Sequence, residues 1–281
     1  MKGPTVTANN VYPSDSSSIH NAGAIEALDA VRGLRTAFEH PAAESSARGE
    51  FQNGHPLAAQ AAADWLVLQL ADSAFPTGGF AHSNGLEAAW QQGEISSPEE
   101  LVGFVQSHLA QTGRAALPFV NEAFHEQRPF ADLDLLCDVF LSNHVANRSS
   151  RAQGQAFLLA ATHAFESSRL RGLRSDVLNE KLPGHLAPVF GAVLRMLNLG
   201  HAACLRLFLF MNLRTLMASA VRLGIIGPMI AQSSQWRLSQ YAEQIALRCA
   251  SLGLAEAAQT SPLLDILHGA HDRLYSRLFQ T

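Results

Sequence analysis

Apolar residues along this chain recur at spacings of three and four, which is the period of an amphipathic helix. No stretch shows the alternation of apolar and polar residues that a half-buried strand requires. The expected fold class is therefore all-α, a single helical bundle domain of about eight to ten helices. The spacing predicts these helices over residues 61–70, from 84 onward, and over 98–112, 117–125, 133–145, 186–197, 201–223, 229–253 and 263–279.

Local signals set several boundaries of these helices. Ser97-Pro98-Glu99-Glu100 is a capping box with proline at the first helical position. The helix over 133–145 is open to continuation as far as Phe165. Residues 167–184 are rich in Arg, Gly, Ser and Pro and are predicted to form a loop. The helix over 201–223 is apolar nearly all round, which predicts a central core helix.

The domain organisation follows from a shift in composition. Residues 1–60 are predicted to be a flexible N-terminal extension, because Asn, Ser, Pro and Gly dominate both of its ends. A short helix is possible around residues 25–38, and the role of the extension stays open between targeting and interaction. Residues 61–281 are predicted to form the helical domain.

The composition favours protein partners and argues against nucleic acid and membrane. Hydrophobic residues make up 47% of the 281 residues and charged residues only 16%, so we expect partner proteins to cover part of the surface. The net charge of −4 and the lack of a basic tract argue against a nucleic-acid partner. The most apolar run, 204–211, is short and contains Arg206, so no membrane span is expected. Cys137, Cys204 and Cys249 lie far apart, which favours reduced thiols and a cytoplasmic location.

Two chemical hypotheses arise from single motifs. Ala81-His82-Ser83-Asn84-Gly85 nearly matches the Gly-x-Ser-x-Gly nucleophile elbow, which leaves a Ser-dependent small-molecule hydrolase using Ser83 and His82 as the alternative function. That motif needs a strand before the serine, and a helix and a proline loop precede it here. His268 and His271 are spaced to share a helix face, and imidazole suits nickel. Two ligands do not complete a site, so no metal-binding or catalytic residue is assigned.

The segment Leu68–Glu87 resembles the opening of UreF-type urease accessory proteins. In that family Leu-x-Asp-Ser leads into Phe/Leu-Pro-x-Gly-x-Phe/Tyr-x-x-Ser-x-Gly-Leu-Glu. The residues that match in order are Asp72, Pro76, Gly78, Phe80, Ser83, Gly85, Leu86 and Glu87. The sequence of residues 78–83 is similar to that of plant members of the family.

Later segments extend this resemblance across about residues 62–281. They match the family's Arg/Lys-x-Ser-x-x-x-Gly, His-x-Ala-Pro-x-Phe-Gly and Arg-Leu-x-x-x-Gly-Pro/Gln segments and its ending. The matching blocks are Arg148–Gly154, His185–Gly191, Arg222–Pro228, Gln259–Asp265 and His271–Phe279. Residues 1–60 lie outside the resemblance.

The resemblance implies an all-α fold, usually a dimer, without catalytic residues. It implies a non-catalytic scaffold that works with a UreD/UreH-type protein and the GTPase UreG to deliver nickel to the urease apoprotein. Nickel is then cargo of the complex, and no tightly bound cofactor is expected. Whether nickel is ligated directly, and whether the GTPase is modulated, stay open.

Two segments are the predicted partner-binding sites. Phe80 and His82 lie in a Gly-rich loop, and binding residues are often held on loops by rigid elements. A position of Phe80 in the core is the competing interpretation. Near the C-terminus, apolar residues at i, i+1, i+4 and i+5 predict one face of a helix that packs on a partner or on the core. With the family's ending, the residues selected there are His271, Leu274, Tyr275, Arg277, Leu278 and Phe279.

Overall fold

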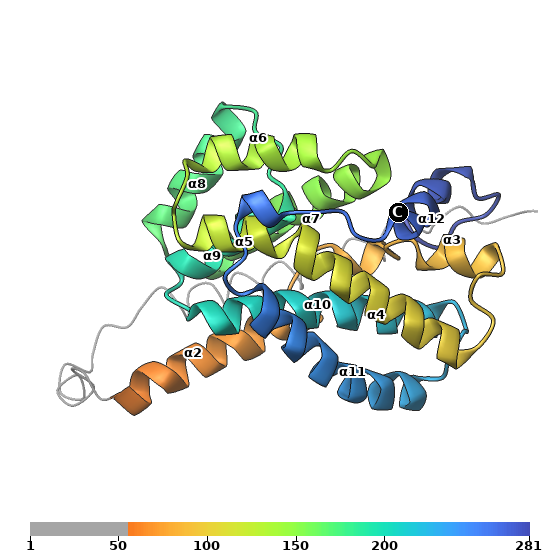
Figure 1. The fold of residues 1–281 in the computed structure, drawn as a ribbon. Coiled ribbons are helices and arrows are strands. Elements are labelled where there is room, and N and C mark those ends of the chain that lie inside the picture. Colours follow the sequence, from red (N-terminus) through yellow and green to blue (C-terminus); the bar gives the residue numbers. More distant parts are fainter. Residues whose placement is uncertain (1–55) are drawn as a thin grey trace, which may run out of the picture. The chain divides into compact units, whose positions relative to one another are not determined.

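The computed structural model describes residues 56–281, and all regular elements in that range are helices or 3-10 turns (Figure 1). The all-α prediction is therefore confirmed for this range. Of the predicted extension, residues 1–55 lie outside the described residues. The α-helices are α2 (Pro56–Ala71), α3 (Leu86–Gln91), α4 (Pro98–Ala115), α5 (Leu117–Phe124), α6 (Phe130–Phe140), α7 (His144–Ala164), α8 (Ser168–Asn179), α9 (Leu186–Met196), α10 (His201–Arg222), α11 (Pro228–Cys249) and α12 (Pro262–Ala270). The 3-10 turns are η1 (Gly79–Ala81), η2 (Leu254–Glu256) and η3 (His271–Arg273).

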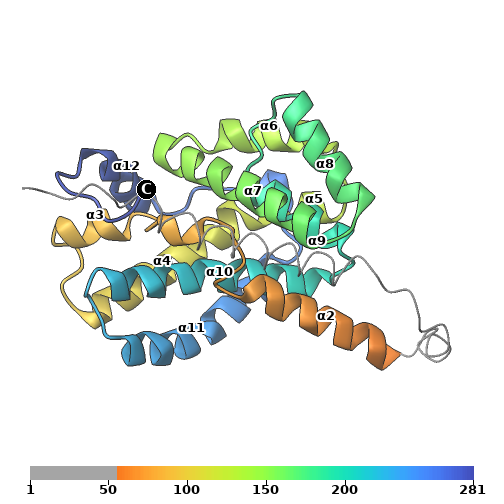
Figure 2. The ribbon, with the colours of Figure 1, turned by 180° about the vertical axis from the view of Figure 1, so that it is seen from behind.

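The centre of the bundle is α10, as its apolar sequence predicts. It packs on α11, α4, α2 and α3, and its buried side chains include Leu205, Phe208 and Leu216. Although α10 is long and apolar enough to span a bilayer, most of it is buried inside the bundle. A second packing centre is α9, which lies between α5 and α7 (Figure 2).

Side-chain caps explain where several helices begin. The capping box at Ser97 is present, with its hydroxyl accepting the Glu100 N–H and the Glu100 carboxylate accepting the Ser97 N–H. Asn143 accepts the N–H groups of Val145 and Ala146 and so starts α7. The possible continuous helix from residue 133 to Phe165 is therefore two helices, α6 and α7.

Two sequence predictions about secondary structure are wrong. The segment 167–184 is largely helical, because Ser167 caps α8 and Leu170, Leu173 and Val177 bury one helical stripe. The helix predicted to run to residue 279 instead ends with α12 and η3. In residues 274–281, called the tail below, the backbone N–H groups of Leu278, Phe279 and Gln280 bond to distant acceptors rather than to carbonyls four residues earlier.

The crossing of α7 and α9 brings two of the sequence blocks together. The Asp134 carboxylate accepts the N–H groups of Gly184 and His185 at 2.6 and 2.8 Å. The fully buried His185 ring pairs with Ser150 and Asp138. At Gly154 an added Cβ would lie 2.1 Å from the Gly184 carbonyl oxygen. Glycine therefore lets the two backbones approach where no other residue fits.

Candidate partner-binding surface

The loop between α2 and α3 depends on two glycines. Gly78 has φ +74° and Gly85 has φ +83°, a conformation that disfavours residues with a Cβ. An added Cβ on Gly85 would also lie 3.1 Å from the backbone N and Cα of His268. Gly85 thus permits α12 to pack closely beside the start of α3.

Glu87, in the first turn of α3, is the main anchor of the tail. Its buried carboxylate accepts the backbone N–H of Leu278 at 2.6 Å and that of Phe279 at 3.1 Å. The fully buried His271 ring donates to the same carboxylate, with Nε2 3.2 Å from Oε2. On the next turn, the Gln91 side chain donates to the Ser276 carbonyl at 2.9 Å. One buried carboxylate therefore fixes the path of the tail.

The end of the tail pairs with the loop that contains η1. The Gln280 N–H donates to the Ala81 carbonyl at 2.8 Å, and the Ser83 N–H donates to Thr281 O at 2.6 Å. The His82 ring pairs through Nδ1 with the Thr281 hydroxyl. Ser83 is fully buried, and its hydroxyl donates to Thr281 O. Ser83 has no sheet beneath it in the described fold and no open approach for a substrate, so the hydrolase alternative gains no support.

Arg222, the last residue of α10, connects the loop to the tail. Its guanidinium carbon lies 3.9 Å from the centre of the Phe80 ring and 4.1 Å from that of Phe279. Its Nη1 also donates to the Phe80 carbonyl at 2.5 Å. A cation between two aromatic faces is stabilising, so Arg222 holds Phe80 and Phe279 in fixed relative positions.

Asp272 attaches the segment before the tail to α7. Arg148 makes a two-point contact with its carboxylate at 2.8 and 3.2 Å, and His144 lies 3.1 Å away. Arg277 approaches the same carboxylate at 3.6 Å. The contacts with Arg148 and His144 lower the pKa of Asp272, with the Arg148 hydrogen bond as the largest cause. The carboxylate therefore stays ionised and paired at neutral pH.

The anchored segments leave four large apolar side chains exposed, which we call the tail surface: Phe80, Trp90, Tyr275 and Leu278. Phe80 is 70% exposed, so its competing placement in the core is wrong. Leu278 is 52% exposed, and Tyr275 is fully exposed. Exposed apolar side chains of this size on ordered segments are typical of protein interfaces.

The structure separates the predicted partner-binding residues into two groups. Phe80, Tyr275, Arg277 and Leu278 are exposed, and Leu274 is half-buried. His82, His271 and Phe279 are buried instead, because they hold the tail against the loop and α3. They are thus positioned to shape the surface rather than to touch a partner.

Sequence reasoning did not select Glu87 or Arg222 as functional residues. Both belong to matched blocks, Gly85-Leu86-Glu87 and Arg222-Leu223, so a signal was present. Their partners lie far away in the sequence: Glu87 bonds to residues 184 to 192 positions away. The contact that gives each residue its role was therefore visible only in the fold.

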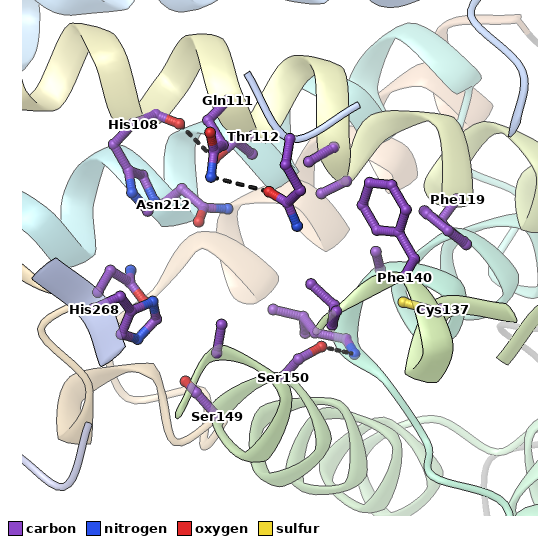
Figure 3. A pocket seen from close by; sticks show the side chains of 18 of the residues that line it. His108, Gln111, Thr112, Phe119, Cys137, Phe140, Ser149, Ser150, Asn212 and His268 are labelled. Carbon is purple, nitrogen blue, oxygen red and sulfur yellow. Dashed lines mark hydrogen bonds between the residues drawn. The ribbon is translucent and has the colours of Figure 1, made fainter. Parts of the chain in front are cut away.

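A cavity of about 160 Å³ lies beside this site, because Asn84 and His268 are among its lining residues (Figure 3). His108, Asn212 and His268 line one side of the cavity, whereas Phe119 and Phe140 line the other. Burial lowers the pKa of His108 to about 4 and that of His268 to about 3. Both imidazoles are therefore neutral at neutral pH, and the cavity carries polar but uncharged groups at that end.

The histidines near the tail are the nearest candidates for nickel ligands in the described chain. Burial, followed by the nearby charges of Arg148 and His271, lowers the pKa of His82 to about 4. In residues 56–281, the His268 Nε2 and His271 Nδ1 atoms are buried without a hydrogen-bond partner. The same range contains no group of three His, Cys, Asp or Glu side chains arranged to hold a metal ion. The described residues therefore offer no third ligand that would complete a nickel site with His268 and His271.

The chain is similar to known urease accessory proteins. Residues 95–239 match the family model described as UreF. The chain is 40% identical to urease accessory protein F of Oryza sativa subsp. indica over 221 residues, covering 77% of this chain and 85% of the relative. It is 40% identical to the Arabidopsis thaliana protein of that name over 219 residues, covering 76% and 91%. The UreF protein of Trichodesmium erythraeum is 29% identical over 221 residues, covering 76% and 94%.

Proposed function

Because the chain belongs to the UreF family and has an accessory role in urease maturation, we propose that it acts there as a non-catalytic scaffold. In this role the tail surface captures a UreD/UreH-type protein, and the assembly with UreG delivers nickel to the urease apoprotein. Nickel is cargo of that assembly. The observation that carries the proposal is an ordered surface of exposed apolar side chains on segments anchored by Glu87 and Arg222.

The energetics favour capture by this surface. Burying a large apolar side chain is worth about 1.5–3 kcal/mol before the costs of ordering and association. The tail backbone is already fixed by Glu87, so little further ordering entropy opposes binding. Phe80, Tyr275 and Leu278 would together contribute about 4.5–9 kcal/mol toward offsetting the cost of association.

The proposal is tested by replacing Phe80, Tyr275 and Leu278 with serine. Since all three side chains are exposed, we expect the thermal midpoint to change little and capture of the UreD/UreH-type protein to fall by at least about 100-fold. The control replaces the exposed Met229, Trp236 and Leu247 of α11 with serine. Equal capture by both triple variants in a quantitative pull-down would contradict this role for the tail surface.

We also propose that the chain forms a homodimer through α2. This helix is apolar around most of its circumference, yet Trp65 is 73% exposed and Leu68 is 61% exposed. Among the described helices its main packing partner is α10. An apolar helix covered on one side only needs a further partner, and homodimer interfaces are apolar.

The expected result is that Trp65→Glu shifts the chain from dimer to monomer in sedimentation, with the dimer dissociation constant raised by about 100-fold or more. Trp236→Glu is the matched control, because Trp236 is similarly exposed, at 75%, but lies on α11. A wild-type chain that sediments as a monomer at tens of micromolar, or a dimer that is insensitive to Trp65→Glu, would contradict the proposed interface.

A further inference from the structure

A second surface lies at the other end of the bundle from the tail. There α7 and α8 border a groove of about 580 Å³, which we call the α7–α8 groove. Its lining residues are Thr162, His163, Phe165, Glu166, Arg171, Arg174, Ser175 and Leu178. Both views show α8 at one end and α12 with the C-terminus at the opposite end (Figures 1 and 2). A protein bound in this groove therefore leaves the tail surface open.

The groove carries unbalanced positive charge. Arg171 and Arg174 are one helical turn apart on α8, so both face the groove. Neither has a carboxylate within 4 Å in residues 56–281, whereas Arg169 on the same helix pairs with Glu126 at 2.7 Å. Glu166 is the one carboxylate among the lining residues. The two guanidinium groups thus keep donors available for an acidic ligand.

These arginines are not needed to attach α8 to the bundle. The helix buries Leu170, Leu173 and Val177 against the core, and Ser167 caps its N-terminus. Arg171 is exposed, and Arg174 is half-buried beside the groove. Since the fold does not use their charges, both guanidinium groups are available to a ligand in the groove.

The walls of the groove distinguish between anionic partners. Leu178 is 62% exposed, and the Phe165 ring is half-buried at the groove, so apolar contact accompanies the charge. Two arginines beside a glutamate suit a carboxylate-bearing polypeptide better than a polyanion, which would need a longer basic track. The net charge of −4 also disfavours nucleic acid.

We propose that the α7–α8 groove binds an acidic segment of a protein partner, with Arg171 and Arg174 pairing with its carboxylates and Leu178 contacting an apolar side chain. Forked pairing with carboxylates is the interaction for which arginine is best shaped. The groove gives the scaffold a second attachment point that is independent of the tail surface.

The test uses the full chain and a short fluorescein-labelled peptide in which glutamates flank two leucines. Fluorescence anisotropy is expected to show saturable binding that weakens as salt rises. Replacing the glutamates of the peptide with glutamine, or its leucines with serine, is expected to weaken binding by about tenfold each. Equal binding of the glutamine peptide would overturn the proposal.

The protein side of the test compares two double variants of equal net charge. Arg171→Gln with Arg174→Gln is expected to weaken peptide binding by about tenfold or more, whereas Arg169→Gln with Arg237→Gln changes it by less than about twofold. Leu178→Ser, which leaves the charge intact, is expected to weaken binding by about threefold to tenfold. The proposal is overturned if both double variants bind alike, or if heparin binds at these arginines and the peptide does not.

Discussion

Replacing Glu87 with alanine is expected to release the tail and to abolish capture of the proposed UreD/UreH-type partner, while the helical bundle stays folded. The substitution leaves the backbone N–H groups of Leu278 and Phe279 and the ring of His271 without their acceptor. Each buried polar group that loses its partner costs about 1–3 kcal/mol, and three such losses at one carboxylate act together against the remaining tail contacts. The tail is expected to detach because water then satisfies these groups.

Hydrogen exchange measures this release directly. In Glu87→Ala the amides of residues 278 and 279 are expected to exchange at least about 100-fold faster than in the unaltered chain. Glu87→Gln keeps one acceptor oxygen and is expected to be intermediate, and the exposed Glu94→Ala serves as the control. If Glu87→Ala exposes the tail and still captures the partner fully, the ordered tail is not what the partner recognises.

Gly154→Ala is expected to have the largest effect on stability. The added methyl group would lie 2.1 Å from the Gly184 carbonyl oxygen and 2.6 Å from the His185 carbonyl carbon and the Leu186 nitrogen. All three atoms belong to the backbone, so no side chain can rotate away. We expect a loss of more than about 3 kcal/mol in the free energy of unfolding, measured from urea titrations.

Gly103→Ala is the matched control for this substitution. Gly103 also lies within a helix, α4, but an added Cβ there meets nothing within 4 Å. Alanine is the better helix former, so the control is expected to gain about 0.5–1 kcal/mol. An unfolding midpoint for Gly154→Ala equal to that of the unaltered chain would show that α7 and α9 do not cross at this distance.

Features set by neighbouring residues could be predicted from the sequence, whereas features set by distant contacts could not. The start of α4 was predictable because the capping box at Ser97 is complete within four residues. Helix α8 was missed because its arginines, glycine and serines outweighed the apolar stripe of Leu170, Leu173 and Val177. The tail was predicted as helix because its apolar spacing fits one, yet the N–H groups of residues 278–280 are satisfied by Glu87 and Ala81.

In the candidate site, too, the local feature was predictable and the long-range contacts were not. Exposure of Phe80 followed from its place in a Gly-rich loop, and this prediction agrees with the fold. The burial of His82 and His271 did not follow, because their partners Thr281 and Glu87 are separated from them by 199 and 184 positions. Spacing along a chain predicts faces of helices, but it does not predict which distant residue satisfies a buried imidazole.

We propose that this chain acts as a scaffold in urease maturation through its anchored tail. Complementation of urease activity in a host that lacks its own UreF protein tests this most directly. We predict that the full chain restores nickel-dependent urease activity, and that a chain lacking residues 273–281 keeps its helical content but restores none. The host also supplies the UreD/UreH-type protein and the UreG that belong with this chain. The proposed role is wrong if the folded full chain restores no urease activity, or if the truncated chain restores full activity.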